Sequence, residues 1–401
     1  MSWLQTGSME NSTMKDSTQL ISFAKCYDRT NGKAVKTINP PIYSASTVLF
    51  ENCEDLLLAN SGNYGGVSYG TDRLPNQRAF EEALRVLEGG YITRAFQSGI
   101  SAIINTLLAF TKSGDHILVC ENVYGPTARF CKKILTRYNI DVDVVSSAVG
   151  ADIADHIREN TRLIFLESPG SNTFEIQDIP AITKLAVKQG IITVLDNTWA
   201  TPLYLKPFDL GIDISIQSVT KYISGHSDVL LGAVTVNKQH AEEFKDFYGI
   251  MEIFASPHDC HLALRGLRTL PIRLKQHENS ALRIAGWLET LDEVEKVIHP
   301  ALPSHPQNHI WKRDFTGSSG LFAFTFKKDY SEEEITAFID TLDFFGIGYS
   351  WGGFKSLITS GKYRRFPESD YFGKTIIRLN IGLEDSEDLI NDLARGFDAL
   401  K

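Results

Sequence analysis

The stretch SIQSVTKYISGHSD, residues 215 to 228, begins like a strand and then places hydroxyls, a lysine, a glycine and a histidine in close succession. One interpretation of Lys221 is an exposed surface charge, which holds for most lysines. A lysine directly after a core strand can instead be partly desolvated, lose its proton and act as an amine nucleophile. The neighbouring Ser218 and Thr220 carry small hydroxyls that suit a phosphate group.

Two further stretches have residue types that complement such a lysine. In FQSGISAIINTLLAF, an apolar helix is preceded by Ser98, Gly99 and Ile100. The first amides of such a helix and the positive end of its dipole form a binding site for phosphate. This signal is weak alone, because many helices begin in this way. In IITVLDNTWA, Asp196 ends a buried strand, and the alternative to a functional role is a helix cap or a turn.

Taken together, these residues meet the requirements of pyridoxal 5′-phosphate (PLP) chemistry. The hydroxyls and the helix start at Gly99 would hold the phosphate, and Lys221 would form a Schiff base with the aldehyde. Asp196 would keep the pyridine nitrogen protonated. The chain has no G-x-G-x-x-G after its first strand and no G-x-x-x-x-G-K-[ST], so neither a nicotinamide cofactor nor a bound nucleotide is favoured.

A scaffold must position these residues, and short apolar runs that alternate with helical patterns predict one. The expected strands are 116–120, 141–146, 162–167, 191–196, 213–217 and 230–236. Helical patterns such as 179–190 lie between several of them. This alternation predicts an α/β fold with a mostly parallel sheet covered on both faces, and with the ligand at the carboxyl ends of its strands.

Three segments of the chain differ in composition and in residue pattern. Residues 1–73 are irregular, rich in Ser, Asn, Gly and Thr, and are expected to form an N-terminal arm that contributes to a neighbouring subunit. Residues 74–267 are expected to form the PLP-binding large domain, which opens with a helix that ends at Gly89. Residues 268–401 are expected to form a smaller C-terminal α+β domain, with one helix opened by a capping box at Ser331.

Composition argues against several other classes of protein. A net charge of −9 argues against a nucleic-acid-binding surface, which requires clustered basic residues. The five cysteines have no C-x-x-C spacing, so neither a disulfide framework nor a metal site is expected. No run of 18 apolar residues indicates a membrane span, and the first 20 residues lack an apolar targeting core. A reducing cytoplasm is therefore the expected compartment.

The order of motifs along the chain makes the sequence recognisable. The motifs are FLESPG, LDNTWATP, QSVTKYISGHSDVLLGA, HPALP, WKRDFTGSSGLF, YSWGG and IRLNIGLED. From about Asn39 to the C-terminus they resemble the Cys/Met-metabolism PLP-dependent enzymes and, within that family, the bacterial branch that cleaves cystathionine. The resemblance implies the aspartate-aminotransferase-like fold (PLP-dependent transferase fold type I). It also implies a homotetramer built from dimers that share active sites.

The resemblance further implies roles for individual residues. Tyr124 in ENVYGPT would stack on the cofactor ring, with a loop or core aromatic as the alternative. Arg378 would bind the substrate α-carboxylate with its planar guanidinium. Ser350 and Trp351 would line the substrate pocket, and a packing role is the alternative for Trp351. Tyr69 would reach the cofactor phosphate of the neighbouring subunit.

One stretch departs from the family pattern. In the family, the tyrosine that corresponds to Tyr69 begins the pattern Y-x-R, which is followed by another arginine or a small residue and then by glycine. The first arginine binds the neighbour's cofactor phosphate. This chain has YGTDRLPNQ, which places Thr71, Asp72 and Arg73 at those positions. Either the phosphate loses a cation, or Arg73 replaces it. Asp72 near a distal substrate carboxylate would repel large dianionic substrates, at a cost on the order of a few kcal/mol.

The expected activity is C–S elimination from cystathionine to homocysteine, pyruvate and ammonia, in which Lys221 moves the Cα proton. The main alternative is amino-acid racemisation, for example of alanine, with Tyr124 or Tyr69 as a second acid on the opposite face. γ-Synthase and γ-lyase activities are further alternatives, although YSWGG favours the β-lyase. The last alternative is a binding protein that has lost its chemistry. The core positions that argue against it are Lys221, Asp196, Tyr124 and Arg378.

Overall fold

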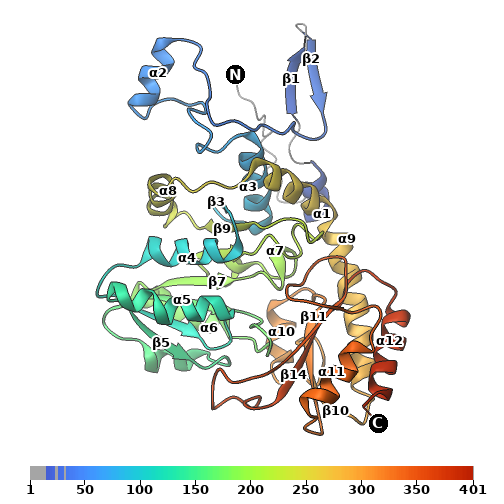
Figure 1. The fold of residues 1–401 in the computed structure, drawn as a ribbon. Coiled ribbons are helices and arrows are strands. Elements are labelled where there is room, and N and C mark those ends of the chain that lie inside the picture. Colours follow the sequence, from blue (N-terminus) through green and yellow to red (C-terminus); the bar gives the residue numbers. More distant parts are fainter. Residues whose placement is uncertain (1–14, 23–25, 31–32, 401) are drawn as a thin grey trace.

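The structure is a computed structural model that describes residues 15–22, 26–30 and 33–400 (Figure 1). A seven-stranded sheet forms the centre of the large domain, with the strand order β3-β9-β8-β7-β6-β4-β5. Its strands are β3 Ile92–Phe96, β4 His116–Cys120, β5 Asp141–Val145, β6 Thr161–Glu167, β7 Ile192–Asp196, β8 Ile214–Gln217 and β9 Gly232–Val236. The neighbours from β5 to β8 run parallel, whereas β9 is antiparallel to both β8 and β3. The prediction of a mostly parallel sheet is confirmed.

Helices connect these strands along the chain. They are α3 Pro75–Glu88, α4 Gly99–Phe110, α5 Gly125–Lys133, α6 Ile179–Gln189, α7 Thr201–Tyr204 and α8 Ala241–Ile250, with short 3₁₀ helices η1 Leu135–Tyr138, η2 Ala151–His156 and η3 Pro207–Leu210. Each predicted strand is present within two residues of its predicted bounds. Sequence reasoning missed β3, because Thr93 and Arg94 interrupt its apolar residues. In the structure the buried Arg94 lies 3.6 Å from the carboxylate of Glu81 on α3.

The C-terminal part of the chain forms a second sheet of five strands, in the order β10-β11-β14-β13-β12. Its strands are β10 Val294–Ile298, β11 Leu321–Phe326, β12 Gly346–Ile347, β13 Leu357–Lys362 and β14 Thr375–Asn380, and its helices are α10 Asn308–Asp314, α11 Glu332–Asp340 and α12 Ser386–Asp398. All of its pairs are antiparallel except β12 with β13. Ser331 and Glu334 form the predicted capping box at the start of α11. Buried phenylalanines, among them Phe322 and Phe324, fill the core of this domain.

A single long helix joins the two sheets. This helix, α9, runs without interruption from Pro257 to Leu288, so the boundary expected at residue 267 falls inside it (Figure 1). Its first half packs against α3 of the large domain, and it also packs against α12 of the C-terminal domain. The link between the domains is therefore a helix instead of a flexible loop.

The N-terminal arm contains regular elements, contrary to the expectation of an irregular segment. They are α1 Asp16–Ser22, the hairpin strands β1 Cys26–Thr30 and β2 Lys33–Thr37, and α2 Cys53–Asn60. The hairpin and α2 stand away from the rest of the molecule (Figure 1). No residue of α2 is buried, and Leu56, Leu57 and Leu58 are all exposed. Within the described residues, no helix is both long and apolar enough to cross a membrane.

Candidate functional site

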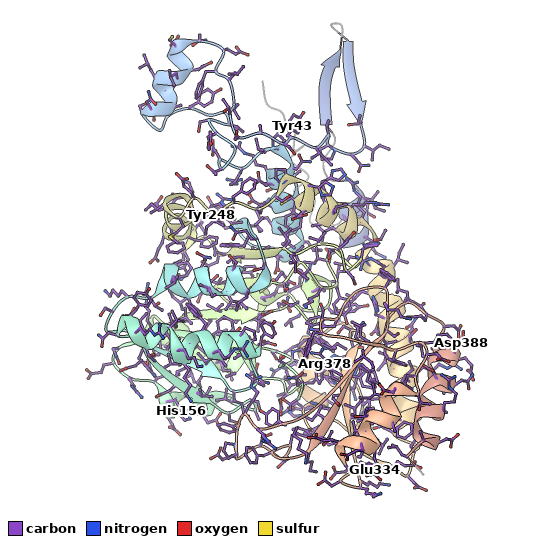
Figure 2. All side chains as sticks on the ribbon, in the orientation of Figure 1. Tyr43, His156, Tyr248, Glu334, Arg378 and Asp388 are labelled. Atoms are coloured by element: carbon purple, nitrogen blue, oxygen red, sulfur yellow. The ribbon has the colours of Figure 1, made fainter. Side chains whose placement is uncertain are left out.

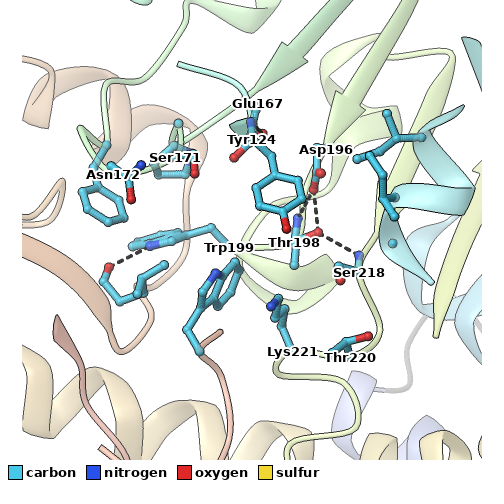
Figure 3. A pocket seen from close by; sticks show the side chains of 18 of the residues that line it. Tyr124, Glu167, Ser171, Asn172, Asp196, Thr198, Trp199, Ser218, Thr220 and Lys221 are labelled. Carbon is cyan, nitrogen blue, oxygen red and sulfur yellow. Dashed lines mark hydrogen bonds between the residues drawn. The ribbon is translucent and has the colours of Figure 1, made fainter. Parts of the chain in front are cut away.

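A pocket lies where the carboxyl ends of β6, β7 and β8 meet the start of α4 and the C-terminal domain (Figure 3). The predicted site residues that line it are Ser98, Gly99, Ile100, Tyr124, Asp196, Ser218, Thr220, Lys221, Trp351 and Arg378. Parallel strands bring their carboxyl ends to one edge of the sheet, which explains why Asp196 and Lys221 converge. Trp351 and Arg378 come from the C-terminal domain, and Arg378 lies toward the centre of the molecule (Figure 2).

One end of the pocket consists of hydroxyls and amides at the start of α4. Ser98 caps this helix, because its Oγ accepts a hydrogen bond from the Ser101 amide at 3.1 Å. The Ser98 O–H stays available as a donor to a ligand. A Cβ atom added at Gly99 would lie 2.5 Å from the Oγ of Ser218, so only glycine allows this close approach. These donors and the helix dipole suit a phosphate group.

The reactive centre of the pocket is the amine of Lys221. Its Nζ donates to the Oγ of Ser350 at 2.7 Å and lies 5.4 Å from the centre of the Trp351 ring. Burial and the positive charge of Arg378 lower the pKa of Lys221 to about 8, although the carboxylate of Asp196 opposes this shift. A useful fraction of the amine is therefore neutral near pH 7, as a nucleophile requires.

The loop that follows β8 is held by hydrogen bonds on two sides. The Thr220 hydroxyl donates to the Leu231 carbonyl at 3.1 Å and accepts from the Leu231 amide at 3.0 Å. This hydroxyl therefore fixes the loop and must rotate to donate to a phosphate. Arg273 of α9 donates to the carbonyls of Tyr222, at 2.8 Å, and Ile223, at 3.2 Å. Sequence reasoning missed Arg273, for which the available signal was a single arginine among the apolar residues of LPIRL.

The buried carboxyl in the pocket is Asp196, at the end of β7. Its Oδ1 accepts from the amide and the hydroxyl of Thr198, at 3.0 Å and 2.5 Å. The Oγ1 of Thr198 in turn accepts from the Ser218 amide at 2.8 Å (Figure 3). Burial raises the pKa of Asp196, while the bonds from Thr198 lower it. The carboxyl can therefore share a proton with a ligand nitrogen. Sequence reasoning also missed Thr198, whose hydroxyl lies two residues after this aspartate.

A second carboxyl, Glu167, ends β6 directly beside Asp196, its partner in the sheet register. Its Oε2 accepts from the Tyr124 amide at 2.6 Å. Burial and the neighbouring Asp196 carboxylate raise the pKa of Glu167 well above its usual range. The Tyr124 side chain faces the pocket and is 47% exposed (Figure 3). Sequence reasoning missed Glu167 as well, although FLESPG was one of the motifs that it used.

Arg378 enters the pocket from the C-terminal sheet. Its Nη2 donates to the Ser350 carbonyl at 3.4 Å, and Ser350 has a left-handed backbone with a φ of 80°. Burial lowers the pKa of Arg378, and the neighbouring groups that act on its charge are Tyr124 and Tyr349 and no carboxylate of the described chain. A partly buried guanidinium in these surroundings fits the carboxylate of a ligand.

Four predicted residues do not line this pocket. Ser350 lies at its edge, where its Oγ accepts from Lys221 Nζ, and the other three lie farther along the chain's N-terminal side. Tyr69 is 51% exposed on the N-terminal arm. The Asp72 carboxylate accepts from the Ser68 amide at 3.1 Å, and Arg73 Nε donates to the buried carboxylate of Glu81 at 2.8 Å. Their contacts with a neighbouring subunit stay predictions. Arg73 would have to leave this ion pair before it could bind a phosphate.

The chemistry of the donors fits PLP. Hydroxyls and helix amides suit its phosphate, the amine of Lys221 suits its aldehyde, and the buried carboxyl of Asp196 suits its ring nitrogen. Among the residues that the structure describes, no group of three or more metal-ligating side chains occurs.

Comparisons with known proteins agree with this chemistry. The family model for Cys/Met metabolism PLP-dependent enzymes matches residues 18–398. The cystathionine beta-lyase MetC of Escherichia coli (strain K12) is 39% identical over 389 residues, which cover 95% of this chain and 97% of that protein. The L-alanine/L-glutamate racemase of Wolbachia pipientis wMel is 39% identical over 394 residues, which cover 95% and 96%. The crystal structure of metB from Corynebacterium glutamicum matches with a TM-score of 0.88 at 31% identity, over 97% of this chain and 99% of that chain.

Proposed function

This chain belongs to the Cys/Met-metabolism family of PLP-dependent enzymes, and on that premise we propose that it is a cystathionine beta-lyase. The reaction converts cystathionine and water to homocysteine, pyruvate and ammonia. The observation that carries the proposal is the meeting of three groups in one pocket. They are an amine with a lowered pKa, a buried carboxyl and a partly buried guanidinium beside which no carboxylate of the described chain lies.

PLP is the cofactor of this site. When bound, it withdraws electrons from the substrate Cα and so acidifies the Cα proton. The start of α4 at Gly99, with the Ser98 and Ser218 hydroxyls, would hold its phosphate. Asp196 would hold the ring nitrogen, and Lys221 would hold the aldehyde carbon.

Three side chains then orient the substrate and move its proton. Arg378 binds the α-carboxylate of the amino acid and so fixes the position of the Cα proton. Ser350, whose Oγ lies 2.7 Å from Lys221 Nζ, orients the amine. The neutral amine takes the Cα proton, and the resulting ammonium donates that proton to the sulfur as the Cβ–S bond breaks. A pKa of about 8 allows one group both to accept and to donate near neutral pH.

The test of this function is product release from L-cystathionine by the purified holoenzyme. We expect pyruvate and homocysteine in equal amounts, and no turnover by Lys221→Ala. Arg378→Leu should raise KM for cystathionine strongly, because the α-carboxylate loses its bidentate partner. A γ-enzyme of the same family would instead release cysteine, and that product, or no pyruvate at all, would reject the proposal.

Amino-acid racemisation is the second candidate function, alone or beside the lyase activity. The Wolbachia relative named L-alanine/L-glutamate racemase favours it. Racemisation needs a second acid on the face opposite Lys221, and we infer Tyr124, which lines the same pocket, or Tyr69 for this role. Incubation with L-alanine tests it, because a racemase forms D-alanine and releases no pyruvate.

We further propose a homotetramer of dimers that share active sites, located in the cytoplasm. The exposed leucines of α2 support an interface on the arm. Cys53, Cys120, Cys131 and Cys260 are free thiols, which is compatible with a reducing compartment. Light scattering of the purified protein measures the subunit number directly.

A further inference from the structure

One peptide group at the edge of the pocket is held on both sides. It joins Val123 to Tyr124. Its N–H, which belongs to Tyr124, donates to Oε2 of Glu167 at 2.6 Å. Its C=O, which belongs to Val123, accepts from Nη2 of Arg365. The N–H and C=O of a trans peptide group point in opposite directions in one plane, so two such partners fix the orientation of that plane.

The two partners come from different domains. Glu167 ends β6 in the sheet of the large domain. Arg365 lies in the loop between β13 and β14 of the C-terminal domain. Tyr363 and Tyr371 of the same loop are buried in the hydrophobic cluster that includes the large-domain sheet. The loop therefore crosses from one domain to the other.

Few other contacts orient Tyr124. It directly precedes α5, so its N–H has no acceptor within that helix, and its side chain makes no capping bond. Its ring is half exposed, so packing alone does not hold it. The direction in which the ring leaves the backbone therefore depends on the peptide group before it.

We propose that Glu167 and Arg365 are positioning residues for Tyr124. They orient the ring that stacks on PLP, and Arg365 makes this orientation depend on the docking of the C-terminal domain. The β13–β14 hairpin bears Arg365 in its loop and Arg378 in its second strand. When this hairpin docks on the large domain, it therefore both places Arg378 in the pocket and orients the ring of Tyr124. The proposal rests on the proposed role of Tyr124.

The hydrogen bond to Glu167 is tested by two variants. Glu167→Leu removes the acceptor, whereas Glu167→Gln keeps an oxygen at the same place. Amide hydrogen exchange of the apoprotein, resolved at Tyr124, needs neither substrate nor cofactor. We expect exchange on the order of tenfold faster in Glu167→Leu, and protection restored in Glu167→Gln. Equal exchange in the wild type and Glu167→Leu would overturn the proposal.

The role of Arg365 is tested in the holoenzyme by Arg365→Met, with Arg364→Met as the matched control on the exposed neighbour in the same loop. We expect Arg365→Met to weaken the visible circular dichroism band of bound PLP and to lower kcat on the order of tenfold or more. KM for cystathionine should change less than kcat, because the Arg378 guanidinium is intact. The control should match the wild type in both readouts.

Two results would overturn the Arg365 part of the proposal. One is an unchanged PLP band in Arg365→Met. The other is an equal loss in Arg364→Met, which would indicate a general effect of loop charge. A thermal unfolding curve for each variant separates misfolding from misorientation. The hydrogen-exchange and dichroism readouts remain informative if the substrate is not cystathionine, so failure of this proposal is distinguishable from failure of the proposed function.

Discussion

At the scale of single residues, the site depends on a coupling between two cations. Arg378 must stay charged to bind a carboxylate, and its charge helps to lower the pKa of Lys221 to about 8. The same guanidinium therefore serves binding and nucleophilicity. When a substrate carboxylate neutralises Arg378, the pKa of Lys221 should rise, which favours the amine as a proton acceptor once the substrate is bound.

This coupling predicts a pH profile for the recombination of the apoprotein with PLP. Only the neutral amine reacts, so the rate should rise with pH and level off above about 8, not above the usual lysine value of 10.5. Arg378→Met removes a positive charge, so its profile should shift to higher pH. Stopped-flow absorbance measures the rate, with Arg364→Met as the control. An unshifted profile in Arg378→Met would refute the coupling.

At the scale of elements, Glu81 joins α3 to β3. This buried carboxylate accepts from the Ala95 amide at 3.0 Å and from Arg73 Nε at 2.8 Å, and it lies 3.6 Å from Arg94. The arginine that interrupts β3 is thus compensated by a charge from the neighbouring helix. Glu81 also holds Arg73, which the sequence suggested as a replacement for a missing phosphate ligand.

We expect Glu81→Leu to lower the free energy of unfolding by about 3–5 kcal/mol, because it leaves the buried Arg94 without its carboxylate. The neighbouring Glu82→Gln is the control. It removes only a surface pair with Arg85, worth about 1 kcal/mol or less. Chemical denaturation at one fixed protein concentration compares the two variants. A loss below about 1 kcal/mol in Glu81→Leu would show that Arg94 finds another partner.

At the scale of the whole molecule, the pocket is bounded by two domains that α9 joins, while the N-terminal arm stands apart from it. Tyr69 and Asp72 lie on that arm, outside the pocket of their own chain. If they act in catalysis, they act in the pocket of another subunit.

Subunit complementation tests this arrangement. Lys221→Ala and Tyr69→Ala should each be nearly inactive as pure proteins. In a mixed dimer one pocket has both an intact Lys221 and the partner's intact tyrosine, so random co-assembly should restore about one quarter of the wild-type activity. Co-expression with two different tags provides the mixed sample. Activity no higher than the mean of the separate variants would place Tyr69 outside the neighbouring site.

Asp72 gives a prediction about substrate choice. Asp72→Arg should lower KM for cystathionine on the order of tenfold, because it replaces a repulsive charge near the distal carboxylate with an attractive one. A small amino acid such as L-alanine lacks that carboxylate and should bind with unchanged KM. Steady-state kinetics with both substrates measures the difference. An equal change for both would show that Asp72 does not contact the distal end.

The sequence sufficed for the features that depend on short stretches. Alternating apolar runs predicted the strands, because burial imposes a local pattern on each one. Asp196 and Lys221 were found because one ends a strand and the other lies in the segment just after a strand, and parallel strands bring these ends to one edge of the sheet. The departure of YGTDRLPNQ from the family pattern was also readable, since it lies within a few residues.

The tertiary structure decided the contacts between distant segments. Nothing near Tyr124 in sequence indicates Glu167 or Arg365, and nothing near Lys221 indicates Arg273 of α9. Nor does the sequence show that Arg73 is held by Glu81, or that the Thr220 hydroxyl is occupied by Leu231. The physical reason is that periodicity and capping act over a few residues, whereas a hydrogen bond between two domains exists only after both have packed.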